Sequence, residues 1–207
     1  MKKILIGLFA LSTMAMAYND VNIYVRAGLE TGKFKKVKYN GEDFTKKTPK
    51  NKGFEVGLEA TQEVLSNLEL GLGIGYQDHS CPKVQDDIEF HGELPLLQSV
   101  PVYLTGKYYI PLVYEFTPYL KADLGYAFNH LKSATYINIK ENWNSKYSYE
   151  NGIYCGIGAG IEYNNITFDI MYKITTAKLK DQDRAEHKTY KNKVDFSRAT
   201  FAIGYKF

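Results

Sequence analysis

The sequence predicts an all-β chain, and three observations lead to this prediction. Apolar residues recur with period two along most of the 207 residues, which is the pattern of a half-buried strand rather than of a helix. The alternation falls into eight segments of about ten residues, the length of a tilted strand that crosses a bilayer. After residue 17 no apolar run approaches the roughly 20 residues of a membrane-spanning helix. Disorder is excluded because 18 Tyr and 11 Phe supply ample apolar surface.

The first 17 residues have the organisation of a secretory signal peptide. Two lysines precede an apolar stretch over residues 4–14, and Ala15-Met16-Ala17 matches a small-residue cleavage site. We therefore predict a signal peptide over 1–17 and a barrel domain over 18–207; a buried N-terminal helix is the alternative. Removing two lysines leaves 24 basic and 23 acidic residues, so the net charge falls from +3 to +1. This small charge argues against nucleic acid as a partner.

The first four segments cover residues 21–30, 54–61, 68–77 and 100–110. In each, apolar side chains occupy one face and polar residues or glycines occupy most of the other. The apolar positions are Val21, Ile23, Val25, Ala27 and Leu29; Phe54, Val56, Leu58 and Ala60; Leu68, Leu70, Leu72, Ile74 and Tyr76; and Val100, Val102, Leu104, Tyr108 and Ile110.

The last four segments cover residues 120–129, 153–163, 166–175 and 199–207 and alternate in the same way. Their apolar positions are Leu120, Ala122, Leu124, Tyr126 and Phe128; Ile153, Cys155, Ile157, Ala159, Ile161 and Tyr163; Ile166, Phe168, Ile170, Tyr172 and Ile174; and Ala199, Phe201, Ile203, Tyr205 and Phe207. Eight is an even number of strands, as bacterial outer-membrane barrels have.

The connections between segments alternate in length. Residues 31–52, 78–98, 130–150 and 177–194 are long and polar, whereas 63–67, 111–118 and 164–165 are brief. Asn164-Asn165 suits a two-residue turn because Asn tolerates positive φ. The chain is thus predicted to form an eight-stranded antiparallel up-and-down transmembrane β-barrel with four long external loops and short periplasmic turns.

The charges of the segments indicate which face is the lumen. The apolar faces carry no Lys, Arg, Asp or Glu, which excludes a soluble barrel with an apolar interior. The opposite faces carry Arg26, Glu55, Glu59, Glu69, Lys107, Lys121, Asp123, Glu162, Asp169 and Lys173. An eight-stranded barrel has an interior just wide enough for side chains, so these ten charges must pair or bind water. Gly71, Gly73, Gly75, Gly156, Gly158 and Gly160 are expected to leave room for the long side chains, with local bulges as the alternative.

The C-terminal segment carries a further pattern. Phe201, Ile203, Tyr205 and Phe207 alternate up to a terminal aromatic residue, which resembles the signal that the barrel-insertion machinery recognises in outer-membrane proteins. With the signal peptide and the eight segments, the chain resembles the OmpX, OmpA-barrel and opacity-protein group. The resemblance implies an exported barrel in the outer membrane of a Gram-negative bacterium, in contact with lipid and lipopolysaccharide. Functions in this group include adhesion, structural support and, in a minority, lipid A or phospholipid chemistry.

The external loops are the expected place of specific contacts because the barrel supports them. The first loop holds eight lysines against Glu42 and Asp43, a net charge of +6, whereas the second is acidic. The lysines are Lys33, Lys35, Lys36, Lys38, Lys46, Lys47, Lys50 and Lys52. Such a basic loop suits lipopolysaccharide phosphates or an anionic host surface. Alternatively, the two loops pair with each other.

Catalysis and metal binding find little support in the sequence. His130 with Ser133 does not match the His-x-Ser spacing of lipid A deacylases, and no third group orients the base. His79, His91 and His187 fall in or beside loops, and the spacing of His79, Cys81 and His91 matches no metal-ligand pattern, so solvated loops are expected. Cys81 and Cys155 are expected to be free thiols. We predict a monomeric, non-catalytic barrel without cofactor or metal, whose loops make its contacts; a narrow ion-conducting pore is the alternative.

Overall fold

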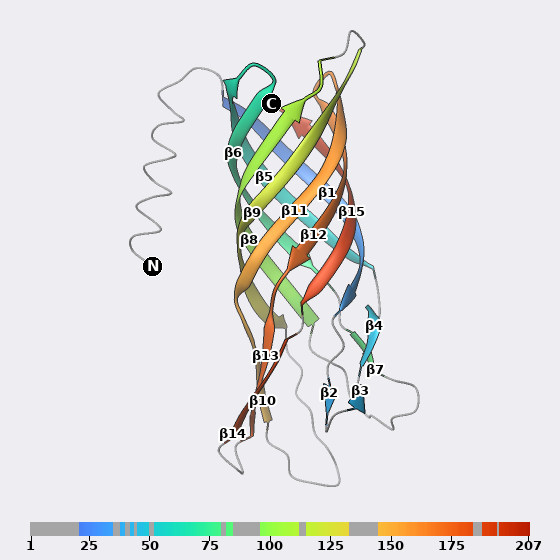
Figure 1. The fold of residues 1–207 in the computed structure, drawn as a ribbon, viewed down its shortest axis with the longest axis vertical. Coiled ribbons are helices and arrows are strands. Elements are labelled where there is room, and N and C mark those ends of the chain that lie inside the picture. The colour runs from blue at the N-terminus through green and yellow to red at the C-terminus, as the bar shows by residue number, and fades with distance from the viewer. Residues whose placement is uncertain are drawn as a thin grey trace, which may run out of the picture.

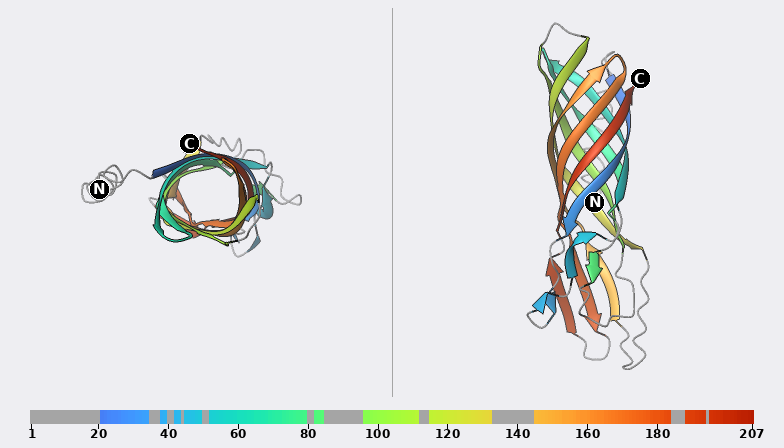
Figure 2. Two further views of the ribbon diagram at one scale, coloured as in Figure 1. Left: turned by 90° about the horizontal axis from the view of Figure 1, so that it is seen from above. Right: turned by 90° about the vertical axis from the view of Figure 1, so that its right-hand side faces the viewer.

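The computed structural model forms one closed barrel of eight antiparallel strands. It describes residues 21–34, 38–39, 42–43, 45–49, 52–79, 82–84, 96–111, 115–132, 145–183, 188–193 and 195–207. The barrel strands are β1 (Val21–Phe34), β5 (Gly53–Leu65), β6 (Leu68–Asp78), β8 (Leu96–Tyr109), β9 (Phe116–Lys132), β11 (Gly152–Tyr163), β12 (Ile166–Thr175) and β15 (Phe196–Lys206). Each pairs with the next, and β1 pairs with β15 to close the ring (Figures 1 and 2). The predicted up-and-down barrel is confirmed.

One end of the barrel, which we call the turn end, carries the short connections. β5 turns into β6 through Ser66 and Asn67, and β11 turns into β12 through Asn164 and Asn165. Asn67 and Asn164 have φ values of 69° and 53°, in the left-handed region that Asn tolerates. The predicted Asn164-Asn165 turn is therefore confirmed.

The other end, the loop end, extends beyond the barrel (Figure 1). β10 (Ser145–Glu150), β13 (Lys178–Asp183) and β14 (Lys188–Lys193) form a three-stranded sheet there. β2 (Lys38–Tyr39) pairs with β3 (Glu42–Asp43), and β4 (Thr45–Pro49) pairs with β7 (Pro82–Val84). At this end the predicted strands are too short. Backbone hydrogen bonds continue there without an apolar face, whereas the alternation from which the strands were predicted ends.

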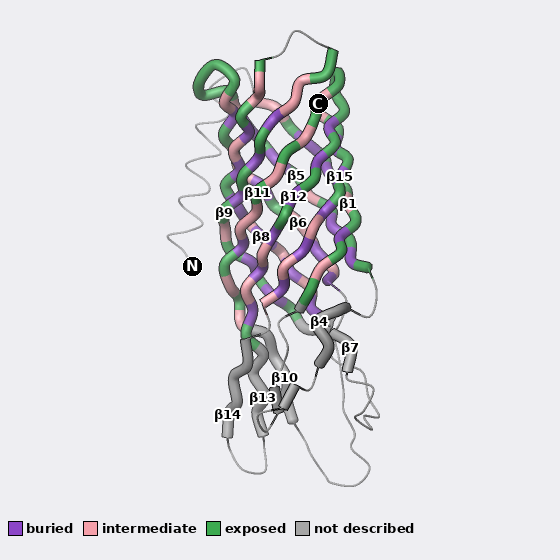
Figure 3. Tube along the Cα trace, turned by 45° about the vertical axis from the view of Figure 1, so that its right-hand side comes forward, coloured by how far each residue is buried: buried purple, intermediate pink, exposed green. Residues whose placement is uncertain are grey.

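Burial alternates along the strands as predicted (Figure 3), and the buried residues are mostly polar whereas the exposed ones are mostly apolar. Outward residues such as Leu29 and Ile157 are 64% and 67% exposed, whereas Lys107 and Lys121 are 0% and 3% exposed. Within the described residues no helix is long and apolar enough to cross a membrane. The wall is apolar and the lumen is polar.

Two glycines show how the lumen admits large side chains. A Cβ at Gly73 would collide with the ring of Tyr103, and a Cβ at Gly160 would collide with the ring of Tyr119. Both tyrosines are buried in the lumen. Room for long side chains, rather than local bulging, is thus the role of these two glycines, as predicted.

Candidate functional site: the charged lumen

The centre of the lumen is built around one carboxylate, that of Glu59 on β5. Arg26 Nη1 lies 3.4 Å and Lys107 Nζ lies 3.9 Å from Glu59 Oε2, and Lys121 forms a direct ion pair with Oε1. Tyr103 also donates a hydrogen bond of 3.0 Å to Glu59 Oε1. Three cations from β1, β8 and β9 therefore converge on a carboxylate that is 2% exposed. We call Glu59, Arg26, Lys107 and Lys121, with Asp169, the central cluster.

Arg26 also links Glu59 to the far wall of the barrel. Its Nη2 forms an ion pair with Asp169 on β12, and Tyr119 donates a 2.6 Å hydrogen bond to the same carboxylate. A guanidinium presents several donors in a fixed fork, so it can serve two carboxylates at once. The central cluster thereby ties β1, β5 and β12 together across the lumen.

Lys107 is held mainly by an aromatic ring. Its Nζ lies 3.0 Å from the ring centroid of Tyr24, a cation–π contact. This nitrogen is buried and has no hydrogen-bond partner among the described residues. Lys107 is therefore the least well satisfied of the three cations around Glu59.

Toward the turn end, the carboxylates of Glu69 and Glu162 accept hydrogen bonds from neighbouring side chains and both lie near Lys206. Thr61 and Asn22 donate to Glu69 over 2.6 and 2.9 Å. Tyr109 donates to Glu162 over 2.9 Å, and Lys206 Nζ lies 3.1 Å from Glu162. The lumen is thus bridged near the short turns as well as at its centre.

Between the central cluster and the loop end, Lys173 Nζ on β12 lies 2.5 Å from Glu55 Oε1 on β5, and Gln77 donates a 3.1 Å hydrogen bond to Glu55 Oε2. Asp123 accepts a 2.8 Å hydrogen bond from Thr105. A cavity of about 20 Å³ beside Lys173 has room for about one water molecule. Side chains fill this level of the lumen.

The loop end of the lumen is closed by five buried polar side chains, the loop-end cluster: Glu30, His79, Ser99, Asn129 and Arg198. Glu30 Oε1 lies 2.5 Å from His79 Nδ1, and Arg198 Nε lies 2.7 Å from Glu30 Oε2. His79 Nε2 lies 3.2 Å from Ser99 Oγ. The ring of His79 also packs against Phe196, with 4.9 Å between centroids.

Glu30, His79 and Ser99 are linked in the order of a catalytic triad, but the hydrogen bond between His79 and Ser99 has the direction opposite to that in a catalytic triad. Asn129 Nδ2 donates to two backbone carbonyl oxygens, those of Glu150 and Thr176, so its Oδ1 must accept. Ser99 donates to that Oδ1 over 2.7 Å. His79 Nε2 must then donate to Ser99, whereas a catalytic serine donates to the histidine. Ser99 is also 0% exposed, so this arrangement does not activate it as a nucleophile.

All ten charges predicted to face the lumen lie on its inner face. Nine of them are at most 8% exposed and lie among other side chains that line the lumen, and the tenth, Glu162 near the turn end, is half-buried. Those described in the ion pairs above are Arg26, Glu55, Glu59, Lys107, Lys121, Glu162, Asp169 and Lys173. The predicted inner face is therefore correct.

Sequence reasoning missed four lumen charges. Glu30 and Lys206 lie on faces correctly assigned to the lumen, but they were not counted with the charges. Arg198 precedes the predicted start of the last strand, although its even number matches the inner face of Thr200 and Gly204. His79 was expected in a solvated loop, and this was wrong because it is 0% exposed. It is drawn inward by its contacts to Glu30 and Ser99, which no local pattern reveals.

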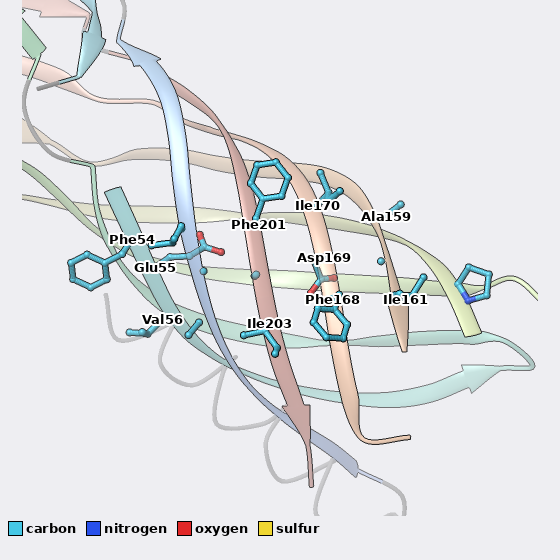
Figure 4. Close-up of a pocket in the computed structure, with 16 residues that line it drawn as sticks. Phe54, Glu55, Val56, Ala159, Ile161, Phe168, Asp169, Ile170, Phe201 and Ile203 are labelled. Carbon is cyan, nitrogen blue, oxygen red and sulfur yellow. The ribbon is translucent and has the colours of Figure 1, made fainter. Parts of the chain in front are cut away.

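The C-terminal alternating residues point outward. Phe201, Ile203, Tyr205 and Phe207 are 56%, 51%, 48% and 70% exposed on the outer face. Phe201 and Ile203 line an apolar hollow of about 990 Å³ that extends over β5, β1, β15, β12 and β11 (Figure 4). Figure 4 shows Phe54, Phe168 and Phe201 on three of these strands. Such a surface suits contact with acyl chains.

The basic first loop is described only in part. Lys33 and Lys52 are exposed; Lys38 lies in β2, and Lys46 and Lys47 lie in β4. Lys35, Lys36 and Lys50 fall outside the described residues. β4 of the first loop pairs with β7 of the second, so the two loops adjoin.

Of the other candidate residues, His130 is exposed at the loop end of β9, and Cys155 is a free thiol. Ser133, Cys81, His91, His187 and the predicted signal peptide lie outside the described residues. Within the described part of the chain, no group of three or more His, Cys, Asp or Glu side chains is placed to hold a metal ion.

Comparisons with known proteins agree with this architecture. A family model described as "Outer membrane protein beta-barrel domain" matches residues 4–207. An uncharacterized protein of Pasteurella multocida, PM1543, is 31% identical over 238 residues, covering 100% of this chain and 98% of its own. The fold is similar to OprG from Pseudomonas aeruginosa, with a TM-score of 0.59, 15% identity and 90% and 95% of the chains covered. It is also similar to Neisserial surface protein A, with a TM-score of 0.50, 14% identity and 89% and 97% covered.

Proposed function

Because the chain belongs to the outer-membrane β-barrel domain family, a family of the Gram-negative outer membrane, we propose that it is a closed, non-catalytic scaffold that presents charged loops to surface molecules. The observation that carries this proposal is the cross-linked lumen. Ion pairs join strands that are not neighbours at the centre and near the turn end, and the Glu30–Arg198 pair joins β1 and β15 at the loop end. The cavity beside Lys173 has room for about one water molecule. A lumen filled in this way supports a rigid platform better than it supports conduction.

Single-channel recording in a planar bilayer tests the closed state. The protein is refolded, and a heat-dependent gel shift first shows that the barrel has formed. We expect no discrete current steps near neutral pH. Current steps in the wild type that vanish when Lys121 is changed to Met would contradict the closed scaffold and show a narrow pore instead.

The proposed ligand of the loops is the phosphate of lipopolysaccharide, bound by the basic first loop. Exposed Lys33 and Lys52 lie where the barrel meets its external extensions, and each lysine near an anionic surface contributes about 1 kcal/mol. Binding of lipopolysaccharide to a variant with all eight loop lysines changed to Gln should fall more than tenfold. A matched variant with Lys178, Lys180, Lys191 and Lys193 changed to Gln should bind as the wild type does. Equal losses in both variants would reduce the proposal to general charge attraction.

Two further parts of the proposal have direct tests. Export with cleavage after Ala17 predicts a mature protein that begins at Tyr18, which intact mass spectrometry measures. Absence of catalysis predicts no acyl chain released from lipopolysaccharide or phospholipid. Release that is lost in Ser99→Ala would make the barrel an enzyme.

A further inference from the structure

The outer wall is hollowed over β5, β1 and β15, which adjoin in the barrel (Figure 4). Two rows of outward side chains cross these strands in register and line the hollow. The row nearer the loop end is Phe54, Leu29 and Phe201, and the next row is Val56, Ala27 and Ile203. Ala27 is the smallest of the six, so the surface is lowest in the middle of the second row. The volume of about 990 Å³ lies at the upper end of the roughly 300–1,000 Å³ of pockets that hold small molecules.

The border of this hollow toward the loop end is basic. On β1 the outward residues after Leu29 are Thr31 and Lys33, and Lys52 immediately precedes β5. Both lysines are exposed. At about 3.3 Å per residue, Lys52 lies about 7 Å and Lys33 about 13 Å from the first row of the hollow, measured along the strands. Two cationic side chains therefore stand where the apolar surface of β1 and β5 ends.

The other side of the barrel has a different border. Where β6, β8 and β9 reach the loop end, Asp78, Gln98 and His130 pair in register. Gln98 Nε2 donates a 3.1 Å hydrogen bond to the Asp78 carboxylate. None of these three side chains has a permanent positive charge, and one is acidic. The hollow and the two lysines thus mark one side of the barrel, that of β5 and β1.

We propose that this side of the barrel is a binding site for lipid A, the membrane anchor of lipopolysaccharide. Its phosphates lie on Lys33 and Lys52, and its acyl chains fill the hollow. The inference rests on the proposed function, because it gives the lipopolysaccharide bound by the first loop a defined position on the wall. Lipid A joins anionic groups to several acyl chains, in the order in which the lysines and the hollow follow each other along β1 and β5.

The two parts of the site contribute differently. Membrane acyl chains are as apolar as the wall, so a chain that enters the hollow gains no hydrophobic free energy. It gains only the packing contacts that an unfilled hollow would lose. The lysines therefore supply most of the affinity, and the hollow determines which lipid fits. A phospholipid has fewer acyl chains than lipid A and is expected to fill the hollow less well.

Native mass spectrometry of the refolded barrel in a neutral detergent measures this binding and counts the bound lipids. The probes are lipid A, monophosphoryl lipid A and phosphatidylglycerol, at one fixed ionic strength. We expect one lipid A per barrel to bind before any other. Monophosphoryl lipid A should bind about fivefold more weakly, the contribution of one lysine near an anionic lipid group. Phosphatidylglycerol, which also has a single phosphate but fewer chains, should bind more weakly still.

Variants separate the two parts of the site. Changing Lys33 and Lys52 together to Gln should lower the affinity for lipid A about 30-fold. Ala27→Phe fills the hollow and should lower it at least threefold. The matched control is Ala122→Phe, the same change at an exposed outward position of β9, which should bind as the wild type does. Ala159→Phe, at the β11 side of the hollow, repeats the test if Ala27→Phe does not show the heat-dependent gel shift of a folded barrel.

The outcomes distinguish this site from the proposed function on which it rests. If the lysine double variant loses binding but the hollow-filling variants bind as Ala122→Phe does, the site on the wall is wrong and the basic loop remains. If the double variant binds as the wild type does while the variant without all eight loop lysines does not, the phosphates are bound elsewhere in the loop and the site is again wrong. If neither lysine variant loses binding, both proposals fail. Phosphatidylglycerol bound as tightly as lipid A, or a barrel dimer that Ala27→Phe abolishes, would also overturn the site.

Discussion

The central and loop-end clusters close the same lumen with different chemistry. In the centre, Glu59 has one guanidinium and two ammonium groups as neighbours. At the loop end, Glu30 has one guanidinium and an imidazole. The centre therefore pairs its carboxylate with arginine and lysine, whereas the loop end adds an imidazole and the neutral side chains of Ser99 and Asn129. The comparison teaches that one barrel can fill its lumen with an ion-pair cluster at one level and a hydrogen-bonded network at another.

The largest effect is expected when the carboxylate at the centre is removed. Glu59→Gln would leave three buried cations without their shared partner, and breaking a buried pair in this way costs about 3–5 kcal/mol. Urea unfolding of the refolded barrel in lipid vesicles measures the loss. The control is Glu63→Gln, at an exposed position of the same strand. Equal stability of both variants would show that the central cluster is not the main plug.

The loop end should tolerate the loss of its cation better. In Arg198→Met, Glu30 keeps its contact to His79 and can take up a proton to become a neutral carboxyl group, so we expect a loss of only about 1–3 kcal/mol. The same unfolding measurement applies. A loss as large as that of Glu59→Gln would erase the proposed difference between the two clusters.

The smallest effect is expected at Lys107. Its ammonium group has no hydrogen-bond acceptor among the described residues, and Glu59 retains two other cations. Lys107→Met keeps the packing against Tyr24 and should change stability by no more than about 1 kcal/mol. If this substitution instead costs as much as Glu59→Gln, all three cations around Glu59 are needed.

The strands were predictable to different degrees at their two ends. Inside the apolar band each residue faces either the lumen or the outside, so alternation marked the strands and Asn164-Asn165 marked a turn. Beyond the band this constraint ends, and the continuation of β9 to Lys132 and the sheet of β10, β13 and β14 left no periodic signal. Their pairing depends on backbone hydrogen bonds, which any residue except proline can make.

The sequence by itself determined the strand number, the antiparallel order, the inverted faces and the ten lumen charges, because each follows from which neighbour in the chain is apolar. Only the tertiary structure decided which charges pair. Glu59 and Lys121 are 62 residues apart, and Glu55 and Lys173 are 118 apart; these pairs depend on barrel closure and strand register. The inward place of His79 was decided in the same way, since its partners come from three other strands and no local pattern of residues encodes such a meeting.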